Sequence, residues 1–198
     1  MPATDGPEYA DDLVRLQTAR WKRLLHVQAP YKWHLRHLRP GRTLEIGCGL
    51  GRNLAHLQGC GVGVDLNADL VAAARARGFL AFTPTEFVVS EHAALGAYDS
   101  LLASHVLEHM TRPEAVELLR TYLPFLRPGG RVIVETPQQR GFDRDPTHVD
   151  YLDHKAVSDV LDRAGVATVR RYSFPLPAAF GSLFVYNQFV TIGAKPPR

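Results

Sequence analysis

The fold is decided by one short stretch, Leu44-Glu45-Ile46-Gly47-Cys48-Gly49-Leu50-Gly51-Arg52-Asn53. A predicted strand runs into closely spaced glycines, and a predicted helix follows them. Glycine lets the backbone turn sharply and approach a ligand without interference from a Cβ. The first turn of a helix also presents free N–H groups. The stretch therefore predicts a ligand-binding turn between a first strand and a helix.

Two classes of adenosine cofactor use such a turn. Dinucleotide-binding folds follow the pattern G-x-G-x-x-G, with the pyrophosphate at the helix N-terminus. Gly47 and Gly49 fit this pattern, but Arg52 stands at the position of the third glycine. Glu45 discriminates better, because a carboxylate just before the turn repels a diphosphate and suits a ligand that carries an ammonium group.

An acidic residue ends the next predicted strand. Asp65 lies eighteen positions after Gly47, about where an acidic side chain accepts hydrogen bonds from ribose hydroxyls in adenosine-binding folds. The alternative is a turn residue beside a helix cap at Asn67. The ribose interpretation fits either cofactor class.

Strand and helix patterns alternate along most of the chain. Strands are expected at 43–46, 61–66, 79–82, 99–105, 131–136, 167–173 and 184–193. Helices are expected at 31–38, 52–58, 67–78, within 84–97, at 113–126 and at 154–164. Strand–helix alternation indicates parallel β-α-β units, while two final strands without a helix between them indicate an antiparallel strand. We therefore expect an α/β Rossmann-like three-layer sandwich, whose mostly parallel seven-stranded sheet has an antiparallel strand in its C-terminal hairpin.

The length of 198 residues suits a single domain. An amphipathic helix is expected at 8–27, ahead of the aromatic-rich helix at 31–38. We expect residues 1–40 to form an N-terminal helical lid and residues 41–198 to form the cofactor-binding core.

The overall composition is that of an ordinary soluble protein, with a net charge of +3 and no cluster of basic residues. Nucleic-acid binding is therefore not favoured. Cys48 and Cys60 are too few for a disulfide framework or a zinc site. The polar, acidic N-terminus lacks the pattern of a signal peptide, and no apolar run is long enough to span a membrane. These features predict a cytoplasmic protein.

Four segments together resemble the successive motifs of the class I S-adenosylmethionine-dependent methyltransferases. They are residues 43–51, 62–65, 98–109 and 126–131, in that family's order and spacing. The resemblance implies S-adenosylmethionine as the cofactor and methyl transfer as the reaction.

The resemblance also implies which residues hold the methionine and ribose parts of the cofactor. Gly47, Cys48 and Gly49 would wrap the methionine end, with Glu45 near its ammonium group. Asp65 would hold the ribose hydroxyls. These roles agree with the charge argument made for Glu45.

Contacts to the adenine and the reacting methyl group are implied further along the chain. Leu66 would pack on the adenine face, and Thr85 or Glu86 would contact the adenine amino group. The segment around these two residues departs from the family's usual acidic pattern. Ser104 and His105 would line the cofactor beneath the reacting methyl.

A catalytic base is expected in the loops that follow strands four and five, because ligands of α/β sheets bind beyond the carboxyl ends of the strands. His148 is the preferred base, since the unperturbed pKa of histidine lies near working pH, and Asp145 is the reserve. The alternative role for His148 is to fix the loop structure. A metal site built from His148, Asp150, Asp153 and His154 lacks a tight ligand spacing, so no metal is expected.

Acceptor contacts are expected from Tyr31 and Trp33 in the lid and from His109 after strand four. Core packing is the alternative for the two aromatic residues, and packing at a helix entry is the alternative for His109. The leading function is methyl transfer to a small-molecule acceptor, at oxygen rather than at nitrogen or carbon. RNA or protein methylation, an NAD-dependent oxidoreductase or epimerase, and a cofactor-binding protein without turnover remain alternatives.

Overall fold

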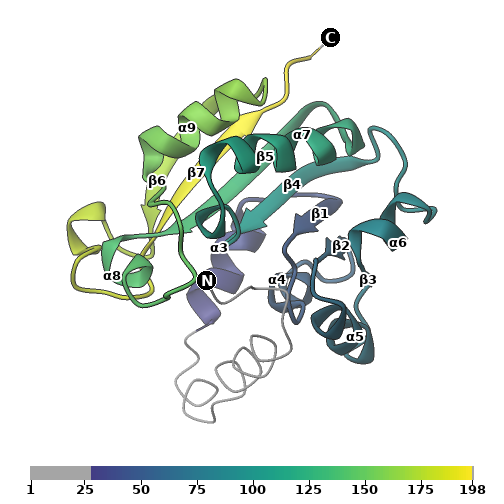
Figure 1. Cartoon of the computed structure of the whole chain (residues 1–198), viewed down its shortest axis with the longest axis horizontal. Coiled ribbons are helices and arrows are strands. Elements are labelled where there is room, and N and C mark those ends of the chain that lie inside the picture. Colours follow the sequence, from purple (N-terminus) through teal and green to yellow (C-terminus); the bar gives the residue numbers. More distant parts are fainter. Residues whose placement is uncertain (1–27, 198) are drawn as a thin grey trace.

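A seven-stranded sheet runs through the computed structural model, which describes residues 28–197 (Figure 1). The strand order is β3-β2-β1-β4-β5-β7-β6, and of these strands β7 alone runs in the opposite direction to the other six. The strands are β1 (Thr43–Ile46), β2 (Gly61–Val64), β3 (Ala81–Phe82), β4 (Tyr98–Ser104), β5 (Leu126–Pro137), β6 (Ala167–Phe174) and β7 (Gln188–Ala194). The predicted Rossmann-like fold and its antiparallel C-terminal strand are confirmed.

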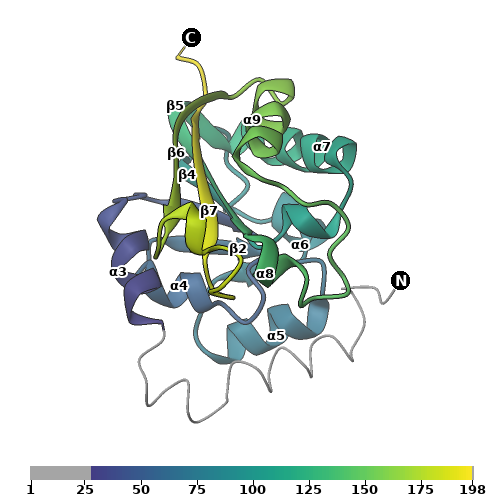
Figure 2. The same cartoon turned by 90° about the vertical axis from the view of Figure 1, so that its left-hand side faces the viewer.

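Helices cover both faces of the sheet, which gives the three layers seen edge-on in Figure 2. One face carries α6 (Pro84–Val88), α7 (Arg112–Tyr122) and α9 (His154–Arg163). The other carries α3 (Ala29–His37), α4 (Arg52–His56) and α5 (Ala68–Ala76). The connections hold α8 (Gln139–Phe142) and the 3₁₀ turns η1 (Leu107–His109), η2 (Leu123–Phe125) and η3 (Ala178–Phe180).

Alternation along the strands divides the apolar side chains between two cores. Leu101 and Val132 pack toward α7 and α9, whereas Leu102 and Ile133 pack toward α3 and α4. Successive strand residues point to opposite faces, so Glu45 lies on the same face as α3 and α4. A buried carboxylate therefore sits in the layer that also holds the glycine turn.

The boundary between α7 and β5 differs from the prediction. The helix ends at Tyr122 instead of Leu126, and β5 begins at Leu126 instead of Arg131. Pro124 explains the early end, since proline has no N–H to donate and disfavours a helical conformation in the residue before it. Leu126 then pairs with Tyr98 at the start of β4.

Smaller differences concern the other connections. The third strand shortens to two residues, the last strand begins at Gln188 instead of Phe184, and α8 was not predicted. The helix before the first strand begins at Ala29 instead of Tyr31, with Pro30 in its first turn, where a missing N–H costs nothing. The helix expected at 8–27 lies outside the described residues. Within residues 28–197 no helix combines the length and hydrophobicity needed to cross a lipid bilayer.

The predicted cap at Asn67 is confirmed, because its side chain accepts hydrogen bonds from the backbone N–H groups of Asp69 and Leu70. We expect Asn67→Ala to lower the free energy of unfolding by about 1 kcal/mol, since both N–H groups lose their acceptor. Asn67→Ser keeps an acceptor and should lose less. Urea denaturation of the three proteins measures the difference, and equal losses in both variants would contradict the capping role.

Candidate functional site

The glycine turn is fixed to the end of the neighbouring strand β2. The backbone N–H groups of Gly47 and Cys48 both donate to the carbonyl of Val64, at 2.7 and 3.1 Å. Gly47 has φ +70°, and a Cβ on it would lie 2.4 Å from Cγ2 of Val106. Gly49 has φ +50°, and a Cβ there would meet no described atom within 4 Å. The turn therefore leaves open space beside the backbone of Gly49.

Asp65 closes this turn from the end of β2. One of its carboxylate oxygens accepts from the N–H of Gly49 at 2.7 Å, and the other accepts from the N–H of Asn67 at 2.9 Å. Burial raises the pKa of this carboxyl. The next residue, Leu66, is 74% exposed and offers an apolar surface at the same edge. Asp65 thus orders the turn, as its alternative interpretation proposed, at the place where the ribose is expected.

Glu45 lies beneath the turn and is almost completely buried, with 2% exposure. Its Oε1 accepts a hydrogen bond from Nδ2 of Asn53 on α4 at 2.8 Å. Its Oε2 has no hydrogen-bond partner among residues 28–197. A buried carboxylate oxygen without a donor is costly, and an ammonium group would satisfy it.

The surroundings of Glu45 favour a cationic ligand. Burial raises the pKa of Glu45 to about 8, and the negative charges of Glu135 and Asp65 contribute to the increase. The Asn53 hydrogen bond and the charge of Arg52 act in the opposite direction. Burial also raises the pKa of the Cys48 thiol, so Cys48 remains a neutral lining group.

A second buried carboxylate, Glu135 at the end of β5, was not predicted. Its Oε2 accepts from the hydroxyl of Ser104 at 2.7 Å, and its Oε1 lies 3.6 Å from Nδ1 of His34 on α3. Nε2 of His34 in turn lies 2.6 Å from the hydroxyl of Tyr172. A lone acidic residue inside the apolar strand Arg131–Thr136 was the available sequence signal. Ser104 thus faces a polar network on the same side of the sheet as Glu45.

His105 follows β4 in a left-handed conformation, with φ +58°. This conformation is uncommon outside glycine and often marks functional positions. Nε2 of His105 lies 3.2 Å from the side-chain oxygen of Gln188 on β7, and Nδ1 lies 3.3 Å from Oε1 of Glu108. Burial lowers the pKa of His105, but Glu108 more than offsets it, so that the net pKa is raised. Gln188 is a further site residue that the sequence did not single out.

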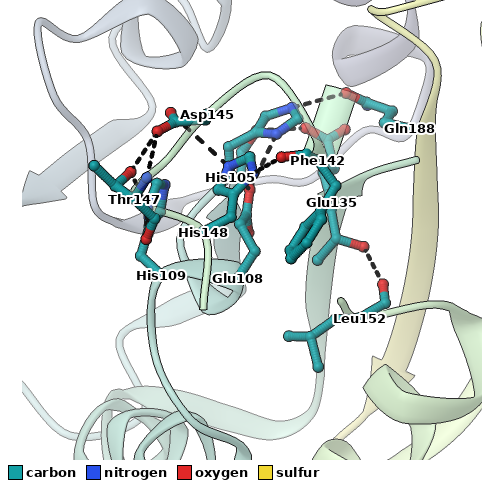
Figure 3. A network of polar contacts seen from close by, with 12 residues as sticks. His105, Glu108, His109, Glu135, Phe142, Asp145, Thr147, His148, Leu152 and Gln188 are labelled. Atoms are coloured by element: carbon teal, nitrogen blue, oxygen red, sulfur yellow. Dashed lines mark hydrogen bonds and ion pairs between the residues drawn. The ribbon is translucent and has the colours of Figure 1, made fainter. Parts of the chain in front are cut away.

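The loop after β5 brings its own polar residues onto η1 (Figure 3). Nδ1 of His148 lies 2.7 Å from the carbonyl of Phe142. The Thr147 hydroxyl donates to Oδ1 of Asp145 at 2.6 Å and lies 2.9 Å from Nδ1 of His109. Burial lowers the pKa of His109, while hydrogen bonds from Thr147 outweigh burial and lower the pKa of Asp145. The predicted residues His148, Asp145 and His109 are therefore brought together.

The two residues expected near the adenine differ in availability. Glu86 completes a capping box with Thr83, and Arg75 reaches both of its carboxylate oxygens at 2.8 and 3.2 Å. Hydrogen bonds from Arg75 lower the pKa of Glu86 to about 2. Thr85 is exposed beside this box. Of the two, Thr85 is more available, and the adenine contact stays a prediction.

The two aromatic residues of α3 that were predicted to contact the acceptor, Tyr31 and Trp33, have different surroundings. The hydroxyl of Tyr31 donates to the carbonyl of Tyr186 at 2.7 Å, and its ring meets Phe174 edge-on. Burial raises the pKa of Tyr31 to about 12. Trp33 is 61% exposed and stacks on His37. Tyr31 therefore contacts the segment between β6 and β7, and Trp33 lies away from these contacts.

The unpaired oxygen of Glu45 and the open space at Gly49 fit an amino-acid tail with an ammonium group, as in S-adenosylmethionine. A family model described as a methyltransferase domain matches residues 13–170. The chain belongs to this methyltransferase family. The enzyme uses S-adenosylmethionine, and the match favours this cofactor over a nicotinamide.

Solved structures agree with this assignment at the level of the fold. A SAM-dependent methyltransferase from Archaeoglobus fulgidus is 20% identical, with a TM-score of 0.65 over 83% of this chain and 93% of that one. A TehB-like SAM-dependent methyltransferase from Corynebacterium glutamicum is 14% identical, with a TM-score of 0.65 over 96% of this chain and 100% of that one. Magnesium protoporphyrin IX methyltransferase from Synechocystis, with bound SAH, is 16% identical, with a TM-score of 0.58 over 85% and 84%. No curated protein sequence matches the chain.

The raised pKa of Glu45 predicts a dependence of stability on pH. Between its ordinary pKa and about 8, this carboxyl is protonated in the folded state and ionised in the unfolded state. Unfolding then releases a proton, so stability falls as pH rises through this window. Glu45→Gln removes this contribution. The free energy of unfolding of the wild type, relative to Glu45→Gln, should fall from pH 5 to pH 8, as urea denaturation at each pH measures. A difference that stays constant with pH would contradict the burial argument.

Two glycine variants separate ligand binding from folding. Gly49→Ala has room for its Cβ, so its folding cost is mainly the left-handed conformation, roughly 1–2 kcal/mol. Gly47→Ala adds the collision with Val106 and should lose more stability. We expect Gly49→Ala to weaken binding of S-adenosylhomocysteine at least tenfold, because the Cβ fills the open space. Calorimetric titration measures the affinity and thermal denaturation the stability; full affinity in Gly49→Ala would show that the cofactor lies elsewhere.

Proposed function

We propose that this enzyme transfers the methyl group of S-adenosylmethionine to the hydroxyl oxygen of a small-molecule acceptor. The observation that carries the proposal is the group of histidine and carboxylate side chains beyond the carboxyl ends of β4 and β5. A hydroxyl acceptor must lose a proton during methyl transfer, and this group offers a proton acceptor.

Residues at the glycine turn would hold the cofactor. Glu45 would pair with its ammonium group, and the backbone from Gly47 to Gly49 would follow its methionine tail. Asp65 would bind the ribose hydroxyls. Each of its carboxylate oxygens accepts one backbone hydrogen bond, from Gly49 or from Asn67, and can accept another from a hydroxyl. When bound, the cofactor supplies the methyl group: its carbon–sulfur bond breaks as a carbon–oxygen bond forms, and the sulfur keeps the electron pair. Ser104 and His105 would line this position at the end of β4.

His148 would receive the proton of the acceptor hydroxyl. Its Nδ1 donates to the carbonyl of Phe142, so its Nε2 carries the lone pair. Asp145 lies 3.9 Å from that Nε2 and would stabilise the imidazolium that forms. His109 would contact the acceptor beside this pair.

The proposal includes the arrangement of the whole chain as one domain, with residues 1–40 as a lid over the core of residues 41–198. The described part of that lid packs on the sheet through Leu35 of α3 and through Leu38, which follows the helix. Tyr31 would reach the acceptor side from there.

A small acceptor is supported by the spread of the positive charge along the chain, and a cytoplasmic location is part of the same proposal.

A transfer assay with methyl-labelled S-adenosylmethionine tests the proposal against a panel of alcohols, phenols, amines, RNA and protein. We expect label in an ether product. His148→Ala should lower kcat by about 100-fold or more and leave the affinity for S-adenosylhomocysteine unchanged. His37→Ala is the matched control and should retain full kcat. Label on nitrogen or in a macromolecule would overturn the acceptor class, and full kcat in His148→Ala would overturn the base.

A further inference from the structure

We propose that Glu108, His109 and His148 bind a divalent transition-metal cation. Each of the three residues offers one ligand atom that lies within 4.8 Å of those of the other two. Two come from η1 and one from the loop after β5, and Figure 3 shows the three side chains converging. This cluster differs from the metal site of His148, Asp150, Asp153 and His154 that the sequence analysis considered and did not favour.

Glu108 is the residue that most needs a cation. Its side chain is completely buried, and within residues 28–197 neither of its carboxylate oxygens accepts a hydrogen bond. Two histidine nitrogens lie nearby: Nδ1 of His105 at 3.3 Å and Nε2 of His148 at 4.0 Å from Oε1. Burying a carboxylate without donors is expensive unless a positive charge neutralises it. A cation between Glu108 and the histidines would supply that charge.

His148 presents a lone pair to this carboxylate. Its Nδ1 donates to the carbonyl of Phe142 at 2.7 Å, which leaves Nε2 as the acceptor nitrogen of the neutral ring. Two electron-rich atoms, Nε2 of His148 and Oε1 of Glu108, therefore face each other at 4.0 Å. Metal-binding histidines commonly donate their second N–H to a backbone carbonyl in this way.

His109 is oriented in the same manner. The hydroxyl of Thr147 donates its proton to Oδ1 of Asp145 at 2.6 Å. It can then only accept from His109, whose Nδ1 lies 2.9 Å away, so the lone pair of His109 is on Nε2. Carboxylate, hydroxyl and imidazole form the kind of outer support that fixes a metal ligand.

The ligand set indicates the class of metal. Two imidazoles and one carboxylate suit zinc and its first-row neighbours better than magnesium or calcium. Bonds of about 2.0 Å in a tetrahedral site put ligand atoms roughly 3.3 Å apart, so binding would draw the three side chains closer together. Three protein ligands leave a coordination position open for another group.

The oxygen of the acceptor hydroxyl would occupy the open coordination position of the metal. Only this role of the metal rests on the proposed function. The cluster lies beyond β4 and β5, where the acceptor is expected. A bound cation would then lower the pKa of the acceptor hydroxyl, and the hydroxyl proton would pass to Asp145, the reserve base, because the metal occupies Nε2 of His148. Metal binding itself does not depend on the acceptor.

Titration of the chelator-treated, tag-free chain with Zn²⁺ and Co²⁺ tests the site. We expect one equivalent to bind, with a cobalt absorption spectrum that lacks the thiolate charge-transfer band, which excludes Cys48 and Cys60 as ligands. Glu108→Gln and His148→Ala should each weaken binding at least 100-fold. Thr147→Val, which removes the support of His109 and the hydrogen bond to Asp145 but none of the three ligands, should weaken it by about 10-fold to 100-fold.

Controls make each outcome decisive. Glu117→Gln and His37→Ala change exposed residues outside the cluster and should bind metal as the wild type does. Binding of S-adenosylhomocysteine, measured on every variant, shows that the fold and cofactor site are intact. If folded wild type and Glu108→Gln bind metal equally, or neither binds it, the metal site is overturned. Failure of the methyl-transfer assay with metal binding intact would overturn the proposed acceptor and leave the site standing.

Discussion

A carboxylate kept out of water beneath a left-handed glycine turn is the constraint on which the rest of the cofactor edge depends. Glu45 is on the interior strand β1, with one oxygen held by Asn53 and the other unpaired among the described residues. The turn above it is tied to β2 through Val64 and closed by Asp65. Burial disfavours the ionised form of Glu45; an ammonium group would stabilise that form, and a neutral or anionic ligand would not.

The sequence predicted the features that depend on neighbouring residues. The glycine turn, Glu45 before it and the Asn67 cap are local patterns, and each determined an element or a contact directly. Glu135 and Gln188 were missed because neither belongs to a local motif: Glu135 is the one acidic residue of β5, and Gln188 is the first residue of β7. Their importance arises only when strand pairing sets Glu135 beside Ser104 and places Gln188 near His105.

The polar cluster after β4 and β5 likewise depends on contacts between residues far apart in the chain, which the sequence did not predict. Both segments were predicted to carry functional residues, and His148, Asp145 and His109 were named. Which nitrogen of each histidine is free depends on loop carbonyls and on the Thr147 hydroxyl. Periodicity does not encode those contacts, because they follow from the path of a connection that has little regular structure. The predicted end of α7 was wrong for a different reason: Pro124 is a local signal that stops the helix at Tyr122, and the predicted helix continued past it to residue 126.

The position of β7 affects how the molecule is assembled during synthesis. Of the described strands this one is the last to leave the ribosome, yet it occupies an interior place in the sheet, between β5 and β6. Until it arrives, the edge of β5 has no partner on that side, and His105 lacks the glutamine that it contacts in the finished protein. The nascent chain therefore completes this edge of the sheet only after all seven described strands have been translated, and an unpaired β5 exposes it to aggregation until then.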